Sequence, residues 1–314
     1  MIYLLFAFFF ASRVFSDVMR KKNSKVFSTS GLTGSLFYVF ETSLFALFYF
    51  WVLNGFVLHF NGRVLLYGLL YGLVVLTTLV PSVFLYNYTT FAFASFVSGS
   101  FALIMSLLSG WLVFGEAITA DKLFRVILML MATGVIFLGR RGDLCKSAPD
   151  EKGKRSGARN LIIAVLLIAF TAVIGAAGTA IMKFYSADPA VTDQNSFFFA
   201  TNVFSALLVL PILPFTMRHD GVSMGDLFGM VKSKKTLYSA ITTINSNLNS
   251  IVQMLLLGMM EVSVFTPLSS AVSFAAVAIA TPIIGEKLDK YTVISTAIAI
   301  ASVVLPPALA ALIG

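Results

Sequence analysis

A stripe of hydrogen-bonding side chains runs along one strongly apolar stretch of the chain, residues 236 to 259. At about 100° per residue in an α-helix, the following side chains fall on one arc of roughly 100°: Thr242, Asn245, Ser246, Asn249 and Gln253. Amide and hydroxyl groups are costly against lipid, so a membrane helix turns them inward. Such a stripe indicates either a polar cavity that binds a solute or hydrogen bonds to neighbouring helices. Five groups on one arc favour the cavity.

A second set of polar side chains lies in the apolar stretch from residue 64 to 87. Tyr71, Thr78 and Ser82 share a narrow helical arc there. Aromatic faces combined with hydroxyls would suit an amphipathic organic solute better than a bare ion, although tyrosine also packs well in ordinary helix bundles. We therefore expect these residues to line a cavity.

A proline interrupts the apolar stretch from residue 262 to 284. Thr266 precedes Pro267, whose missing N–H frees a backbone carbonyl, and Ser270 follows on the same side. The freed carbonyl could bind a solute or could simply make the helix bend. Thr266 and Ser270 are therefore further cavity candidates.

Three ionisable residues lie within apolar stretches near the N-terminus: Arg13, Asp17 and Glu41. A charge in a membrane segment is costly unless it is paired or neutralised by protonation. One interpretation is a structural ion pair, Arg13 with Asp17 four residues later or Arg13 with Glu41. The other is that Glu41 couples transport to protons or recognises a cation, with Arg13 as its counter-ion.

The amino-acid composition indicates which kind of element positions these side chains. Of the residues, 58% are hydrophobic and 11% charged, and the mean hydropathy is +0.93, which predicts a polytopic membrane protein. A membrane helix needs about 20 apolar residues, whereas a membrane β-barrel would show shorter segments of alternating polarity. We predict an all-α protein with ten transmembrane helices, at approximately 1–19, 33–56, 64–87, 90–114, 121–139, 160–184, 195–216, 236–259, 262–284 and 289–312.

Two stretches, residues 99 to 138 and 269 to 308, look like copies of one design. Each is an apolar run followed by Gly-Glu, a short polar turn and a second apolar run; the dipeptides are Gly115-Glu116 and Gly285-Glu286. An odd number of crossings separates the copies, so the two halves would have opposite orientations in the membrane. We predict two inverted five-helix repeats, residues 1–139 and 160–314, joined by a charged linker at 140–159.

The repeat also sets expectations for individual positions. Thr201 and Asn202 align with Glu41 and Thr42, so the charge of Glu41 occurs in one half alone. In each Gly-Glu turn the glycine permits a tight helix end, and we expect the glutamate to lie near the start of the next helix, where the helix dipole favours a carboxylate. The alternative to this structural role is a role of the turns in coupling or gating.

The two Gly-Glu turns, each at the end of a fourth repeat helix, resemble those of EamA-type members of the drug/metabolite transporter superfamily. The resemblance covers the whole chain. It implies a solute carrier with a central cavity between the halves, lined mainly by the first, third and fourth helices of each repeat. It also implies termini in the cytoplasm, the arrangement usually drawn for better-studied relatives.

The basic residues predict the opposite orientation. Of the 22 Lys and Arg residues, Arg13 lies in the first segment, and those outside the odd-numbered loops are Arg63, Lys122, Arg125 and Lys183. Because basic loops stay in the cytoplasm, we expect the odd-numbered loops there and both termini outside, in a bacterial plasma membrane. The first segment has no basic residues before its apolar run, so we expect an anchor and not a cleaved signal peptide.

Other functions find little support in the residues. The single cysteine, Cys145, and the two histidines, His59 and His219, offer no material for a catalytic centre or a metal site, and we expect no catalytic residue, metal or cofactor. The net charge of +8 is spread over the loops, which argues against nucleic acid. The expected partners are a small-molecule solute and the lipid bilayer, and a proton or another ion is a candidate co-substrate. The alternatives are an intramembrane enzyme and a non-transporting membrane scaffold or receptor.

Overall fold

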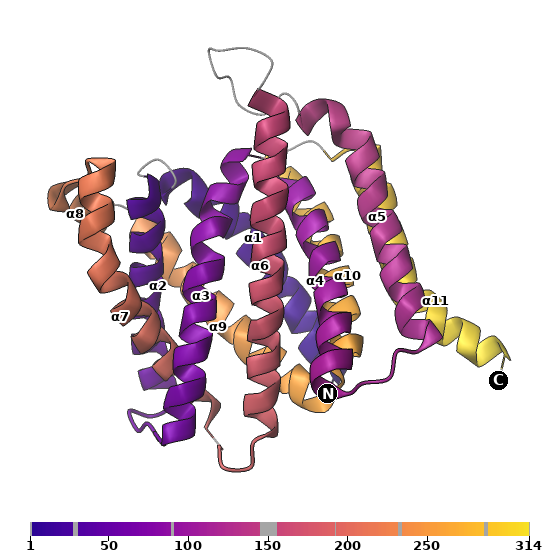
Figure 1. Ribbon diagram of the computed structural model, residues 1–314, viewed down its shortest axis with the longest axis horizontal. Coiled ribbons are helices and arrows are strands. Elements are labelled where there is room, and N and C mark those ends of the chain that lie inside the picture. Colours follow the sequence, from indigo (N-terminus) through magenta and orange to yellow (C-terminus); the bar gives the residue numbers. More distant parts are fainter. Residues whose placement is uncertain are drawn as a thin grey trace. The chain divides into compact units, whose positions relative to one another are not determined.

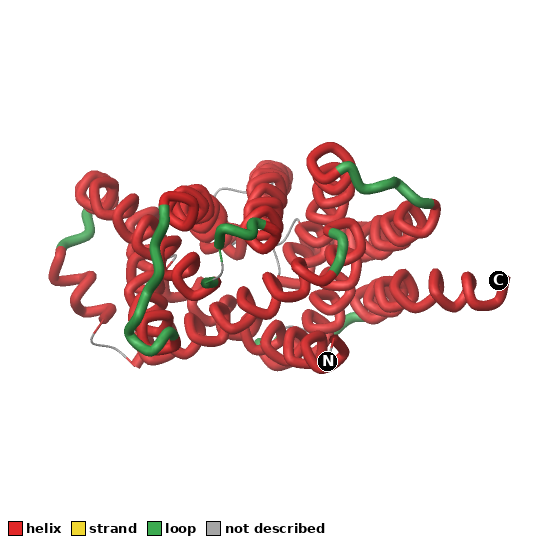
Figure 2. The backbone as a smooth tube through the Cα atoms, turned by 90° about the horizontal axis from the view of Figure 1, so that it is seen from below, coloured by secondary structure: helices red, strands yellow, loops and turns green. Residues whose placement is uncertain are grey.

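The computed structural model describes residues 2–27, 31–88, 91–144, 156–191, 193–231, 234–285 and 288–313. Within these ranges the protein consists of helices joined by loops and contains no strand (Figures 1 and 2). The helices are α1 Ile2–Phe27, α2 Gly31–Leu53, α3 Gly62–Tyr88, α4 Phe91–Phe114, α5 Ala120–Leu144, α6 Ser156–Ala187, α7 Gln194–Asp220, α8 Met224–Val231, α9 Lys234–Met259, α10 Val262–Ile283 and α11 Lys290–Ile313. The all-helical class predicted from composition is confirmed.

In the described part of the chain, seven helices are long and apolar enough to cross a bilayer: α2, α3, α4, α5, α6, α7 and α10. Helix α1 carries Arg13 and Asp17, and α9 carries the polar stripe, which lowers its apolar character. The apolar part of α11 that meets the composition criterion, Lys290–Val303, is shorter. Seven such helices are typical of a polytopic membrane protein, whereas the expectation of ten spans stays a prediction.

The structure differs from the expected elements at two places. Helix α5 continues to Leu144 and α6 begins at Ser156, so helices extend into both ends of the segment expected to be a linker, and the remainder of that segment lies outside the described residues. The short helix α8 was not expected. It begins with a capping arrangement in which Ser223 and Asp226 bond each other's backbone N–H groups, at 2.8 and 3.2 Å.

The chain divides into two compact units, each built from segments of both sequence halves. Unit 1 comprises Met1–Val18, Leu85–Ala180 and Met259–Gly314, and unit 2 comprises Met19–Phe84 and Ile181–Gly258. These units group residues by proximity in space, so the predicted repeats at 1–139 and 160–314 stay a prediction.

In unit 1, helix α4 packs antiparallel to α10, and α5 packs antiparallel to α11. Small residues allow close approach: a Cβ on Gly99 would lie 2.4 Å from the ring of Phe274, and a Cβ on Gly139 would lie 2.1 Å from that of Tyr291. The buried core between these helices is mainly aromatic and aliphatic, and includes Phe93, Phe96, Met129, Ile136, Ile168, Phe274 and Val277. Packing of these apolar side chains is what holds unit 1 together.

In unit 2, helix α2 packs antiparallel to α7. At one end the carboxylate of Asp220, the last residue of α7, accepts hydrogen bonds from the backbone N–H and the hydroxyl of Thr33, at 2.8 and 2.9 Å. At the other end Asn54, just past α2, donates to Asp193, the N-cap of α7, at 2.8 Å. A carboxylate therefore satisfies the free N–H groups at the start of each helix, and both contacts tie one helix to the other.

Candidate functional site

The polar stripe of α9 faces the interior of the protein. Thr242 and Asn249 are buried, and Asn245, Ser246 and Gln253 are partly buried. By contrast, Ile241 and Ile244 are exposed. The structure thus places the stripe away from the exposed side of α9.

Glu41 of α2 lies beside the first turns of α9. Its side chain is 7% exposed and faces the hydroxyls of Thr236 and Ser239. Its Oε2 atom has no hydrogen-bond partner, and neither does the hydroxyl of Ser239, so the approach of Glu41 to Ser239 falls outside hydrogen-bonding geometry. Ser239 lies one turn before Thr242 and extends the stripe toward Glu41. A carboxylate therefore stands at one end of the polar stripe.

Thr201 of α7 has the same character as Glu41, with which it aligns in the repeat. Thr201 is 1% exposed and its hydroxyl has no partner. The neighbouring residues also correspond: Thr42 donates to the carbonyl of Tyr38 at 2.8 Å, and Asn202 donates to the carbonyl of Phe198 at 2.7 Å, each four residues back. The two helices thus carry a buried oxygen at positions that correspond in the predicted repeat, and only in α2 does this oxygen belong to an acid.

Unsatisfied polar atoms gather on three helices of unit 2. In the part of the chain that the structure describes, these buried atoms have no hydrogen-bond partner: Glu41 Oε2 and Tyr49 OH on α2, Thr201 Oγ1 on α7, and Ser239 Oγ and Asn247 Nδ2 on α9. More than nine in ten buried polar groups in folded proteins are hydrogen-bonded. Five exceptions on three helices of one unit indicate groups whose partner is water or a solute.

The candidate cavity residues on α3 already have partners within the protein. The hydroxyls of Thr78 and Ser82 donate to carbonyls of their own helix, Val74 and Leu79, each at 2.7 Å. The ring of Tyr71 packs on Phe197 and Phe198, with centroids 5.5 and 6.4 Å apart. These contacts give Tyr71 a packing role in unit 2, the alternative that the sequence left open.

The α10 candidates, Thr266 and Ser270, belong to unit 1 and are buried. Thr266 donates its hydroxyl to the carbonyl of Val262 at 3.0 Å. The charged pair of α1 also belongs to unit 1: Arg13 Nε lies 3.6 Å from Asp17 Oδ1, within ion-pair distance but too far for a hydrogen bond. The expected pairing of Arg13 with the acid four residues later is therefore present.

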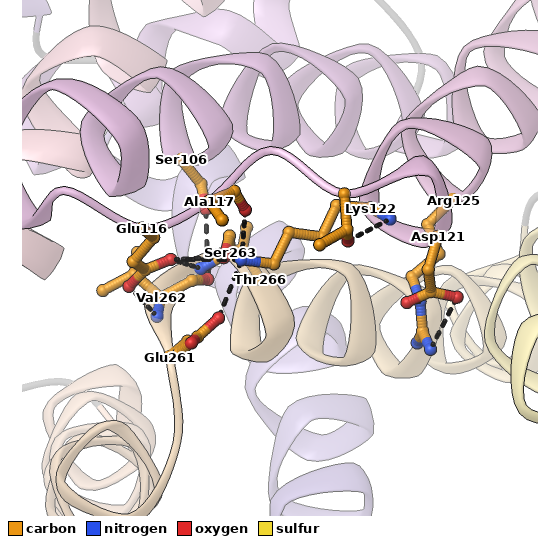
Figure 3. Close-up of polar contacts among 11 residues, drawn as sticks. Ser106, Glu116, Ala117, Asp121, Lys122, Arg125, Glu261, Val262, Ser263 and Thr266 are labelled. Carbon is orange, nitrogen blue, oxygen red and sulfur yellow. Dashed lines mark hydrogen bonds and ion pairs between the residues drawn. The ribbon is translucent and has the colours of Figure 1, made fainter.

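The first Gly-Glu turn holds a contact that the sequence did not predict. Glu116 lies not at the start of α5 but at the start of α10, where it accepts hydrogen bonds from the backbone N–H groups of Val262 (2.9 Å) and Ser263 (3.0 Å) and from the Ser263 hydroxyl (Figure 3). The expectation that a helix dipole stabilises this carboxylate holds, but the helix belongs to the other half of the sequence. The second turn residue, Glu286, lies outside the described residues.

Lys122 and Glu261 complete this cluster. Lys122 is 5% exposed, and its ammonium lies 2.7 Å from a Glu261 oxygen, 2.8 Å from the carbonyl of Ala117 and 4.0 Å from Glu116 Oε2. The sequence signal for Lys122 is a basic residue six positions after Glu116 at the start of an apolar helix. Glu261 could be recognised as the residue just before α10, although its partner could not.

Further ionised groups of unit 2 lie at the start of α3 and in the connection between α6 and α7. Arg63 binds both oxygens of Asp188, at 2.7 and 2.8 Å, and this hydrogen bond lowers the pKa of Asp188. Burial raises the pKa of Asp193, but hydrogen bonds from Ser196, Asn54 and the backbone outweigh it, and the pKa is lowered overall. These contacts hold the start of α3 and the residue after α2 against the connection between α6 and α7. Among the described residues, no three His, Cys, Asp or Glu side chains lie close enough to hold a metal ion.

Comparison with known proteins identifies the fold and nothing finer. No protein-family model matches the chain, and no curated protein matches it. A solved structure described as "Crystal structure of protein" is 16% identical, and the match covers 96% of this chain and 98% of that chain with a TM-score of 0.60. At this identity the likeness shows a shared fold, and a fold alone does not determine a function.

Proposed function

We propose that the chain is a secondary transporter that moves a small organic solute across a membrane through a central polar cavity, by alternating access. The observation that carries the proposal is the group of buried, unpartnered polar atoms on α2, α7 and α9. A protein selected for stability alone would satisfy such atoms or replace them with apolar ones. Their retention in a membrane protein favours a site whose hydrogen-bond partners arrive with the solute.

The helix pairing supports two inverted repeats. Helices α2 and α7 are the second helices of the two predicted halves, and α4 and α10 are the fourth; each pair is antiparallel. In both pairs an acid at the C-terminal end of one helix caps the N-terminus of its counterpart: Asp220 caps α2, and Glu116 caps α10. An inverted repeat with a pseudo-twofold axis places equivalent helices antiparallel, so that the C-terminal end of one lies beside the N-terminus of the other.

The proposal extends to the family and the topology. We assign the chain to the EamA-type transporters on the strength of the two Gly-Glu turns and the helix pairing, with α1, α9 and α11 as further membrane spans that bring the total to ten. The distribution of Lys and Arg favours cytoplasmic odd-numbered loops and outward termini in a bacterial plasma membrane.

Glu41 gives the proposed site its chemistry. Its partly satisfied carboxylate is buried beside the hydroxyls of Thr236 and Ser239. Such a group would take up a proton or accept a hydrogen bond from a cationic solute, and either event would satisfy Oε2. Proton coupling through Glu41 is therefore part of the proposed mechanism, with amides and hydroxyls of the α9 stripe as the recognition groups.

A thermal-shift screen of the purified protein against a library of polar metabolites tests this function. A solute that binds the folded protein raises its apparent stability according to its concentration and affinity. We expect a class of stabilising solutes whose effect disappears in the variant Asn249→Leu. A lipid substrate turned over by the purified protein would instead favour the intramembrane enzyme, and an absence of any stabilising solute would favour the scaffold.

A further inference from the structure

The contact between Glu116 and α10 joins the ends of two helices that pack differently along their length. Toward the middle of α10 the contact is apolar and tight: the rings of Phe96 and Phe274 lie 4.2 Å apart, and Phe274 fills the space beside Gly99. At the Glu116 end the contact is made by small and polar groups. Ser106 donates to the carbonyl of Val262 at 3.3 Å, and the Glu116 carboxylate supplies the remaining bonds.

Such an arrangement would allow α10 to pivot against α4 around the Phe274 contact. Gly110, beside the Glu116 carboxylate, follows Gly99 by eleven residues, which is about 16 Å along a helix. A rotation of about 15° around the Phe274 contact would therefore separate the polar ends by about 4 Å. That separation breaks the bonds of Glu116 to Val262 and Ser263 while the apolar contact persists. Polar contacts between small residues part more readily than interlocked aromatic rings, because water replaces the lost hydrogen bonds.

Lys122 offers the carboxylate a second partner. In this structure the ammonium contacts Glu261 at 2.7 Å and lies 4.0 Å from Glu116 Oε2. Glu116 and Lys122 belong to the same connection between α4 and α5, so they stay together when α10 moves. A carboxylate that leaves the α10 N-terminus can therefore pair with Lys122 and is not left as an uncompensated charge. The cluster thus has two satisfied arrangements, as a two-state element requires.

We infer that Glu116 is a gating residue. It closes one end of the α4–α10 pair when its carboxylate caps α10, and it opens that end when its carboxylate leaves α10 and pairs with Lys122. This inference rests on the proposed transport function, because a gate serves a path for solute. The sequence offers gating only as an alternative role of the Gly-Glu turns and does not identify the partners of Glu116, which are separated from it by 146 and 147 residues.

Cysteine labelling tests the gate without knowledge of the solute. In a Cys145→Ser background, Thr266→Cys places a thiol one turn below Ser263 at a buried position, and Ser302→Cys places one at a position of 0% exposure in α11 of the same unit. The probe is N-ethylmaleimide, applied to the protein in lipid nanodiscs. We expect Glu116→Gln to increase the labelling rate at position 266 at least about tenfold, because charge-assisted bonds are lost, while position 302 changes less than about twofold.

In the variant Lys122→Met, the direction in which the labelling rate at position 266 changes shows which arrangement Lys122 stabilises. If Lys122 stabilises the open arrangement, its loss should slow labelling at position 266; if it merely braces the closed cluster, labelling should become faster. Faster labelling in Lys122→Met, an unchanged rate in Glu116→Gln, or equal acceleration at both thiols would overturn the gate. If the labelling results contradict the gate but the thermal-shift screen finds stabilising solutes, the transport proposal stands without the gate. If the labelling results support the gate but no solute stabilises the protein, the transport proposal is refuted instead.

Discussion

Thr201 provides a sharp test of the unsatisfied polar groups, because an isosteric change removes its hydroxyl alone. Its Oγ1 has no partner and the side chain is 1% exposed. A buried polar group without a partner costs about 1–3 kcal/mol, and valine is β-branched like threonine and nearly equal to it in shape. Thr201→Val should therefore stabilise the protein by about 1 kcal/mol while weakening solute binding.

Ser205, one turn further along α7, is the matched control. Its hydroxyl donates to the carbonyl of Thr201 at 2.9 Å and to that of Gly72 at 3.3 Å, so Ser205→Ala loses real hydrogen bonds and should destabilise by about 1 kcal/mol. The two variants should thus move the apparent melting temperature in opposite directions, by about 2–4 °C each.

The assay is thermal unfolding in detergent at a fixed scan rate, because membrane proteins commonly unfold irreversibly. Fluorescence of the purified variants gives the apparent melting temperature. A decrease for Thr201→Val comparable to that for Ser205→Ala would refute the reasoning, since it would mean that the Thr201 hydroxyl has a stabilising partner in the solute-free protein.

Three further predictions concern the site and its supports. Asn249→Leu and Gln253→Leu should abolish the thermal shift produced by a stabilising solute, whereas Ile244→Leu on the exposed face should preserve it; equal loss in all three would exclude the stripe as a recognition surface. Glu41→Gln should remove uptake driven by a pH gradient in proteoliposomes yet leave solute exchange, and retained gradient-driven uptake would exclude coupling through this acid. The lowered pKa of Asp193 means that its stabilising contribution is complete above the unfolded value of about 4 and is lost as pH falls through the folded value. Asp193→Asn should therefore flatten the loss of melting temperature on acidification from pH 6 to 3, and an unchanged slope would contradict that role.

The helices themselves were readable from the sequence, because long apolar runs determine helical membrane segments locally. Expected segments such as 33–56 and 262–284 correspond to α2 Gly31–Leu53 and α10 Val262–Ile283. Helix α8 was not predicted because it is short. The residues that indicate it are Ser223 and Asp226, which form its N-terminal cap, and the buried Leu227. The inward orientation of the α9 stripe followed from its helical arc.

Contacts between distant segments could not be read in this way. The sequence placed Glu116 beside the next helix, whereas its partners are at the start of α10. Helix periodicity placed Asn247 about 160° from Asn249, yet Asn247 is partly buried with an unpartnered amide nitrogen. Both cases depend on which helices surround a side chain, and the pattern of a single segment carries no such information.

Uptake of a metabolite mixture into proteoliposomes tests the transport claim most directly. Vesicles that contain the wild-type protein, the double variant Thr201→Val/Asn249→Leu or no protein would be incubated with a mixture of small polar and amphipathic metabolites, and their contents measured by mass spectrometry. We expect at least one solute to enter wild-type vesicles faster than it enters either control. Identical contents in all three vesicle types, with correctly folded protein in the membrane, would contradict it.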